Sequence, residues 1–149
     1  MPAAATLAPT KLTGHAVVVG YGRVGRLVVD GLKQDGASFL VIEDAADALE
    51  HLRSQGVEVL TGNAADERLL RAANLAAARI LFVAIPQAFE AGQIVQQARR
   101  ANPAIDIIAR AHFDAEVEHL FSMGANAVIM GEREIAQSML THARTAHAV

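Results

Sequence analysis

Residues 15–29 read HAVVVGYGRVGRLVV, and this stretch decides the fold. The β-branched run before the glycines is typical of a buried strand, and the apolar residues after them recur at helical spacing. The glycines therefore mark a strand-to-helix turn. Gly20 permits a tight turn, Gly22 lets a pyrophosphate approach the backbone, and Gly25 lets the helix pack close to the strand. The first N–H groups of that helix are then free to bind phosphate.

A second apolar strand, residues 39–42, ends in Glu43. Glu43 lies 18 residues beyond Gly25 (43 − 25), where an acidic side chain can accept hydrogen bonds from ribose hydroxyls. Glu43 and Asp44 also place negative charge where the 2′-phosphate of NADP(H) would sit. A strand before the turn, a helix after it and an acid at the end of the next strand form the context of a dinucleotide-binding turn. The alternative is a glycine turn that serves only packing.

The rest of the chain alternates helices and strands. Asp66 and Asp114 are expected to cap the helices that they begin, and the apolar run of residues 79–85 predicts a strand buried on both faces. The alternation predicts an α/β fold, a Rossmann-type, doubly wound, parallel six-stranded sheet in the order 3-2-1-4-5-6 with a C-terminal helix. The later strands are expected at residues 57–61, 79–85, 106–111 and 127–130, and the later helices at residues 46–55, 66–73, 87–101, 114–123 and 132–143.

A ligand of such a sheet lies over the carboxyl ends of the first and fourth strands. Arg23 would oppose the dipole at the start of its helix, so a nearby anion would explain it, although an exposed turn residue is the alternative. Arg110 and His112 could contact a ligand or a partner subunit, or form a surface pair. The residues expected to bind the ligand are Gly20, Tyr21, Gly22, Arg23, Val24, Gly25, Glu43, Asp44, Gly62, Asn63, Ala64, Ala84, Ile85 and Pro86.

The composition limits the class of protein. The chain has 149 residues, 52% of them hydrophobic, which suits one domain with an aliphatic core. Its net charge of −3 and the lack of a basic cluster beyond Arg99-Arg100 argue against a nucleic-acid partner. There is no cysteine, the histidines show no ligand spacing, and no apolar run is long enough to insert in a membrane, so we expect no metal site and no membrane insertion. We expect a flexible lead-in or linker at 1–13, a nucleotide-binding domain at 14–144 and a tail at 145–149.

Several segments together resemble a known family. VVVGYGRVG, LVIE, GNAAD, FVAIP, IIARAH and GANAVIMGEREIA are similar to the RCK or TrkA-N regulatory domain of potassium transport proteins. The resemblance covers about residues 14–141 and is strongest to the cytosolic domain of Kef-type cation:proton antiporters, in particular the YbaL-like branch. It implies that Asn63 and Ala64 lie where the family's Gly-Asp-Ala turn meets adenine, and that Arg23 contacts phosphate. Asn63 replaces the common Asp, so the charge at that position is absent.

The resemblance also implies a function. Family members bind NAD(H) or an adenine nucleotide such as AMP, and the bound ligand biases a potassium channel or antiporter through rearrangement of a dimer. We therefore expect a cytoplasmic regulatory domain, held at the cytosolic face of the inner membrane by a transporter domain absent from this chain. The C-terminal helix carries an apolar stripe that includes Ile135, Met139 and Leu140, which predicts a homodimer interface. Packing of this stripe on its own sheet is the alternative.

Two other functions remain open. A stand-alone regulatory subunit of a potassium channel would bind ATP or ADP. A small NAD-dependent oxidoreductase is a second alternative, but the chain leaves no second domain for a substrate and its sole tyrosine lies within the glycine turn. We therefore expect a binding protein and no catalytic residues.

Overall fold

The computed structural model describes residues 7–147 and contains one six-stranded parallel sheet. The strand order is β3-β2-β1-β4-β5-β6, which confirms the predicted order. Val17 of the central strand pairs with Leu40 on one side and Leu81 on the other. The strands are β1 (Ala16–Val19), β2 (Phe39–Glu43), β3 (Val59–Thr61), β4 (Ile80–Val83), β5 (Asp106–Ala111) and β6 (Ala127–Met130).

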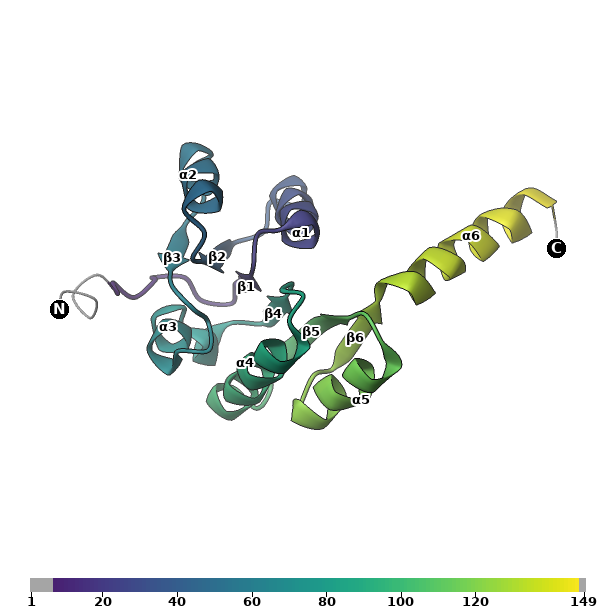
Figure 1. Cartoon of the computed structure of the whole chain (residues 1–149). Coiled ribbons are helices and arrows are strands. Elements are labelled where there is room, and N and C mark those ends of the chain that lie inside the picture. The colour runs from purple at the N-terminus through teal and green to yellow at the C-terminus, as the bar shows by residue number, and fades with distance from the viewer. Residues whose placement is uncertain (1–6, 148–149) are drawn as a thin grey trace.

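The first five α-helices divide between the two faces of the sheet (Figure 1). On β1, Ala16 and Val18 point to the cluster that contains α1 and α2, whereas Val17 and Val19 point to the cluster that contains α3, α4 and α5. This alternation is the period of a β-strand buried on both faces. The helices are α1 (Arg23–Gln34), α2 (Ala46–Ser54), α3 (Glu67–Ala72), α4 (Ala88–Ala101), α5 (Asp114–Met123) and α6 (Gly131–His147), with a short 3-10 helix η2 (Leu75–Ala77).

One half of one face is not covered, which corrects a prediction. The strand β4 was expected to be buried on both sides, but Ile80 and Phe82 are only half-buried, whereas Leu81 and Val83 are fully buried. The helices α1 and α2 lie over β1–β3, and none of the helices in residues 7–147 covers the same face over β4–β6 (Figure 1). The second half of this face is therefore open.

The helix starts agree only in part with the sequence. The carboxylate of Asp66 accepts a hydrogen bond from the Arg68 N–H at 2.9 Å, so the predicted cap of α3 is confirmed. The prediction for Asp114 was wrong, because the residue before α5 is Phe113, whose side chain makes no cap, and Asp114 is the first helical residue. Asp114 instead pairs with Arg133 of α6 at 2.6 Å. A contact between two elements far apart in the chain thus replaces the local one.

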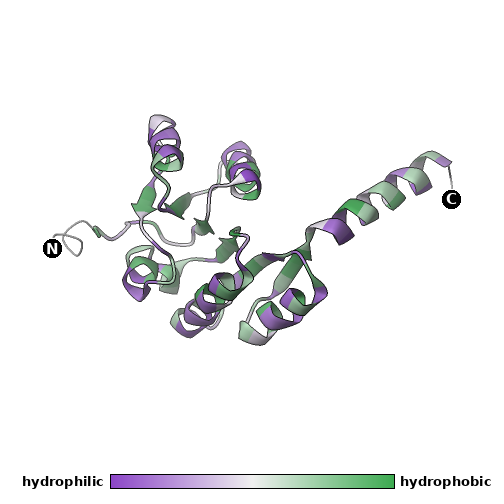
Figure 2. Ribbon diagram, viewed as in Figure 1, coloured by the Kyte–Doolittle hydropathy of each residue, from purple (hydrophilic) through white to green (hydrophobic). Residues whose placement is uncertain are grey.

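The helix α6 projects away from the body of the molecule (Figure 1). It continues to His147, beyond the predicted end at residue 143, and contains no buried residue. Figure 2 shows apolar residues along this projecting helix. Exposure is 62% for Ile135, 69% for Met139 and 45% for Leu140, so the predicted stripe does not pack on its own sheet.

The segment before β1 contacts the body without forming a helix or strand. The N–H of Thr10 donates to the Ala72 carbonyl at 2.8 Å, and the side chain of Asn74 donates to the Leu12 carbonyl at 2.9 Å. Residues 1–6 of the expected lead-in and 148–149 of the expected tail lie outside the described residues. Within residues 7–147, no helix combines the length and the apolar character that crossing a bilayer requires.

Candidate functional site

The three motif glycines meet different surroundings. A Cβ atom on Gly25 would lie 2.1 Å from the carbonyl oxygen of Gly20, so only glycine allows α1 to pack this close to β1. Gly20 has a φ of 98°, which favours glycine for its backbone conformation. A Cβ on Gly22 would meet no atom within 4 Å. Gly22 therefore borders open space, as a site for an approaching phosphate requires.

That open space is a crevice at the carboxyl ends of β1 and β4, with a volume of about 600 Å³. A smaller cavity of about 40 Å³ adjoins it, shares Gly20 and Glu43, and extends to Asn63. Every predicted site residue except Gly25 lines one of these two cavities, and Gly25 is buried beneath the turn. The residues lining the larger crevice are Gly20, Tyr21, Gly22, Arg23, Val24, Glu43, Asp44, Ala84, Ile85, Pro86, Gln87, Glu90 and Arg110.

The helix α1 presents an uncapped N-terminus to the crevice. Gly22 is its N-cap, no side chain caps the helix, and its first turn contains no acidic residue. The first N–H groups of a helix favour an anion, and an acid in the first turn is their usual internal partner. Arg23 in this turn is exposed and lines the crevice. The arrangement is suited to an external anion.

The carboxylate of Glu43 links the turn to the end of β2. Its Oε1 accepts the Tyr21 N–H at 2.8 Å, and its Oε2 accepts the N–H groups of Asp44 and Ala45, each at 2.8 Å. A carboxylate has about four acceptor positions. These three bonds leave about one position, on Oε1, for a further donor such as a hydroxyl. The neighbouring Asp44 is exposed and lines both cavities.

Tyr21 contributes its backbone to the crevice, whereas its side chain belongs to the core. Tyr21 is 4% exposed, and its ring stacks on His51 with centroids 5.8 Å apart and has the Arg26 guanidinium 5.0 Å from its centre. Burial raises the pKa of the Tyr21 hydroxyl, and the nearby Arg26 charge opposes that rise. The Tyr21 ring thus packs in the core beside α2.

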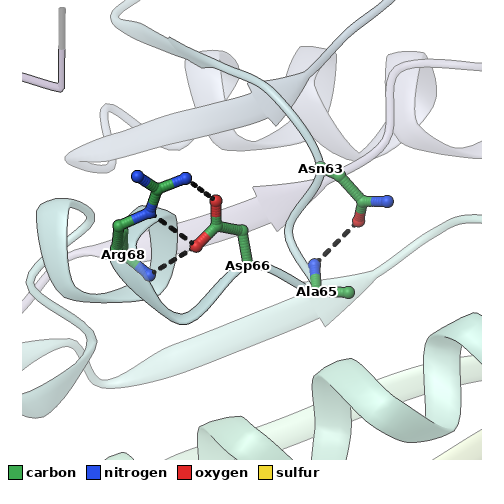
Figure 3. Close-up of polar contacts among 4 residues, drawn as sticks. All are labelled: Asn63, Ala65, Asp66 and Arg68. Atoms are coloured by element: carbon green, nitrogen blue, oxygen red, sulfur yellow. Dashed lines mark hydrogen bonds and ion pairs between the residues drawn. The ribbon is translucent and has the colours of Figure 1, made fainter. Parts of the chain in front are cut away.

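The turn after β3 is held by its own side chains (Figure 3). The side-chain oxygen of Asn63 accepts the Ala65 N–H at 2.8 Å. Asp66 accepts the Arg68 backbone N–H at 2.9 Å and pairs with its guanidinium at 2.8 Å. Side-chain and backbone hydrogen bonds from Arg68 hold the pKa of the Asp66 carboxyl below its ordinary value. Because the side-chain oxygen of Asn63 already accepts a hydrogen bond, its amide N–H groups are the ones that can donate to a ligand in the adjoining cavity.

Three residues of the crevice were absent from the predicted set. Gln87 is the N-cap of α4 and Glu90 lies in the first turn of that helix. The crevice therefore extends beyond the predicted residues 84–86 into the start of α4. Arg110, which was left open between a ligand, a partner and a surface role, lines the crevice from β5. Its guanidinium donates to the Ala84 carbonyl at 3.5 Å and lies 3.2 Å from Nε2 of His112.

A third cavity lies on the open half of the sheet. This apolar groove has a volume of about 460 Å³ and runs from α1 across β4 and β5 to the start of α6. Val24, Ala84 and Arg110 line both the groove and the crevice, so the two cavities share a wall. The other groove residues are Val28, Phe82, Val83, Ile108, Ala109, Ala111, His112, Phe113, Ile129, Gly131 and Glu132.

Metal ligands are not grouped in the part of the chain that the structure describes. No three histidine, aspartate or glutamate side chains in residues 7–147 lie close enough together to hold an ion. Among the described residues, one histidine lies within 4.0 Å of a carboxylate: Nδ1 of His112 is 3.8 Å from Glu116.

The chain is similar to domains of known transport proteins. The TrkA-N domain model matches residues 16–131. The chain is 47% identical over 132 residues to YbaL of Escherichia coli (strain K12), a protein named as a cation/proton antiporter. It is 32% identical over 132 residues to the glutathione-regulated potassium-efflux system protein KefC of Salmonella arizonae. These matches cover 89% of this chain but only 24% of YbaL and 21% of KefC, so the chain spans about a quarter of the length of these relatives.

Solved structures agree with the fold. The TrkA-N domain of the inner membrane protein YbaL from Escherichia coli superimposes with a TM-score of 0.85 and 46% identity over 89% of this chain and 98% of that one. The AMP-bound Kef C-terminal domain of Shewanella denitrificans superimposes with a TM-score of 0.74 and 25% identity, over 89% of this chain and 80% of that one. The GsuK channel bound to NAD superimposes with a TM-score of 0.73 and 26% identity, over 81% of this chain and 22% of that one.

Proposed function

Because the chain belongs to the TrkA-N domain family, we propose that it binds NAD(H) or an adenine nucleotide such as AMP and thereby controls a potassium or cation:proton antiporter. The observation that carries this proposal is the open space at Gly22, in front of the uncapped start of α1. Backbone N–H groups at a helix start are a general site for phosphate. The solved relatives that hold AMP and NAD support the same class of ligand.

The crevice suggests how the ligand lies. The phosphate contacts the start of α1 and Arg23, and the ribose lies against Glu43 and Asp44. Because Glu43 already accepts three backbone N–H groups, we expect it to take one ribose hydroxyl through Oε1, and Asp44 to take the other. The base lies beside Asn63, whose amide N–H groups can donate to a ring nitrogen.

The proposal describes a binding protein and not an enzyme. Control of a transporter requires only that the ligand binds two conformations of the domain with different affinity. The membrane part of such a transporter is the proposed partner, which would place this domain at the cytosolic face of the inner membrane. A regulatory domain of a potassium channel is the second candidate, favoured by the likeness to GsuK.

We further propose that the chain forms a homodimer through α6. The stripe of Ile135, Met139 and Leu140 is exposed, and none of the helices within residues 7–147 covers the apolar groove over β4–β6. These two surfaces are complementary in character, so the stripe of one subunit seats in the groove of the other. Given the exposed fractions of the three side chains, burying them is worth roughly 3–5 kcal/mol for each helix.

Calorimetry with AMP, ADP and NAD tests the ligand. We expect at least one of them to bind, and a chain that binds none would overturn the proposal. Light scattering tests the dimer, with an expected mass of about twice 15.7 kDa. Replacing Met139 and Leu140 together by glutamate should shift the chain toward monomer and leave nucleotide binding intact. Replacing exposed Gln137 and Ser138 on the same helix by glutamate is the matched control and should keep the dimer. A dimer that persists in the Met139 and Leu140 variant would refute this interface.

A further inference from the structure

We propose that Arg110 couples nucleotide binding in the crevice to docking of the partner's helix in the apolar groove. This inference rests on the proposed function and concerns its regulation. Arg110 lies near the end of β5. Three residues line both the crevice and the groove, namely Val24, Ala84 and Arg110, and Arg110 is the charged one. Its side chain can therefore respond to a ligand on one side and change the wall on the other.

The present contacts of Arg110 are weak ones. Its Nη1 donates to the Ala84 carbonyl at 3.5 Å, and its Nη2 lies 3.2 Å from Nε2 of His112. A guanidinium has five N–H donors, and it can bind phosphate through two parallel N–H···O bonds to an opposite charge, whereas neither the carbonyl nor the imidazole carries a negative charge. A phosphate in the crevice therefore competes effectively for this side chain.

His112 marks the groove side of the contact. It lines the groove and not the crevice. It is held from α5, because its N–H donates to Glu116 at 2.7 Å and its Nδ1 lies 3.8 Å from the same carboxylate. With His112 fixed by α5, movement of the guanidinium toward the crevice separates Arg110 from His112. The groove wall then loses a positive charge.

This movement sets the sign of the coupling. An apolar helix that docks in the groove removes water from its wall, and desolvation of an unpaired guanidinium there is unfavourable. A bound phosphate neutralises Arg110 and draws it to the crevice side, so the empty groove becomes more apolar. Nucleotide binding therefore strengthens the dimer, and dimer formation strengthens nucleotide binding by the same factor.

Sedimentation of the full chain with and without saturating AMP measures the coupling. We expect AMP to lower the dimer dissociation constant of the wild type by about fivefold or more, the lower end of typical coupling between sites. In Arg110→Gln, AMP should still bind by calorimetry but should no longer change the dimer constant. Arg110→Lys retains the charge without the fork of two donors and should keep only part of the effect. Melting curves establish that both variants are folded.

Arg23→Gln is the matched control, since Arg23 lines the crevice but not the groove. It should weaken AMP binding, yet at saturating AMP it should show the wild-type change in the dimer constant. The inference is overturned if AMP leaves the wild-type dimer constant unchanged, if the chain stays monomeric, if Arg110→Gln keeps the full effect, or if Arg23→Gln loses it as well. Failure of the proposed function is a different result, because wild-type protein would then bind no nucleotide in calorimetry.

Discussion

Replacing Gly25 by alanine adds one methyl group against the backbone of the glycine turn. The new Cβ would lie 2.1 Å from the Gly20 oxygen and 2.8 Å from the Gly20 carbonyl carbon. The atoms that it meets are backbone, which cannot turn aside as a long side chain can. The helix α1 must therefore move away from β1 by about 1 Å, since an overpacked site against backbone relaxes through a backbone shift. This movement disturbs the packing of Val29 and Leu32, the other buried residues of that helix.

Two effects of opposite sign determine the stability of Gly25→Ala. Alanine favours a helix interior over glycine by about 0.5–1 kcal/mol. Overpacking costs about 1–3 kcal/mol, and the close contact with backbone places this site at the upper end of that range. We expect a net loss of about 2 kcal/mol in the free energy of unfolding, which lowers the melting temperature by roughly 6 °C for a chain of this size.

Gly22→Ala makes the same chemical change at the other side of the turn and is the control. Its Cβ meets nothing within 4 Å and its φ is −83°, so only the weaker helix cap of alanine opposes folding. We expect a melting temperature within about 3 °C of the wild type, given a cap difference below about 1 kcal/mol. AMP affinity should fall, because the methyl group occupies the space in front of the phosphate.

Scanning calorimetry and titration with AMP measure both variants. A Gly25→Ala domain as stable as the wild type would refute the argument that helix and strand are in contact through this glycine. A Gly22→Ala domain that is stable and binds AMP with wild-type affinity would show that no phosphate approaches the backbone there.

Three further predictions concern the ligand, the chemistry and the pH dependence of stability. NAD(H) or AMP should bind at least tenfold more tightly than NADP(H), because Glu43 and Asp44 repel a 2′-phosphate by about 1.4 kcal/mol or more; calorimetry showing equal affinities would contradict this. With NADH and a panel of small carbonyl compounds no turnover should appear, and steady NADH oxidation that a single crevice substitution abolishes would instead indicate an enzyme. Asp66→Ala should lower the melting temperature at pH 7 through loss of the α3 cap. Arg68 lowers the pKa of the Asp66 carboxyl in the folded protein. The stability that Asp66 contributes is therefore complete above the ordinary carboxyl pKa and is lost as the pH falls through the lowered pKa. The melting temperatures of the wild type and Asp66→Ala should converge in acid.

Much of the candidate site follows from adjacent residues in the sequence. The positions of Gly20, Gly22 and Gly25 between an apolar strand and an amphipathic helix predict the turn, and the structure places the crevice there. Alternating strands and helices together with right-handed crossovers predict the order of the sheet. Such features depend on local periodicity, which a single sequence contains in full.

The sequence did not reveal which groups were already engaged. Glu43 was identified as a ribose ligand, but only the folded chain brings the Tyr21 N–H within 2.8 Å of its carboxylate and reduces what it can still accept. Asp114 had the pattern of a helix cap, yet Arg133 lies close enough to pair with it. Hydrogen bonds between residues distant in the chain depend on how the elements pack, and composition and spacing do not contain that information.

The sequence by itself thus determined the fold, the glycine turn and the class of ligand proposed for it, because each depends on short stretches of chain. Only the tertiary structure decided that no helix of the described residues covers one half of a sheet face, that α6 stands away from the body, and that Arg110 lies in the wall between crevice and groove. Right-handed crossovers place α1 and α2 on one face and the helices α3–α5 on the other, so β4–β6 stay open on the face of α1. Within residues 7–147, α6 follows β6 and is not itself followed by a strand. Which surfaces remain exposed is therefore a property of the assembled layers and not of any one segment.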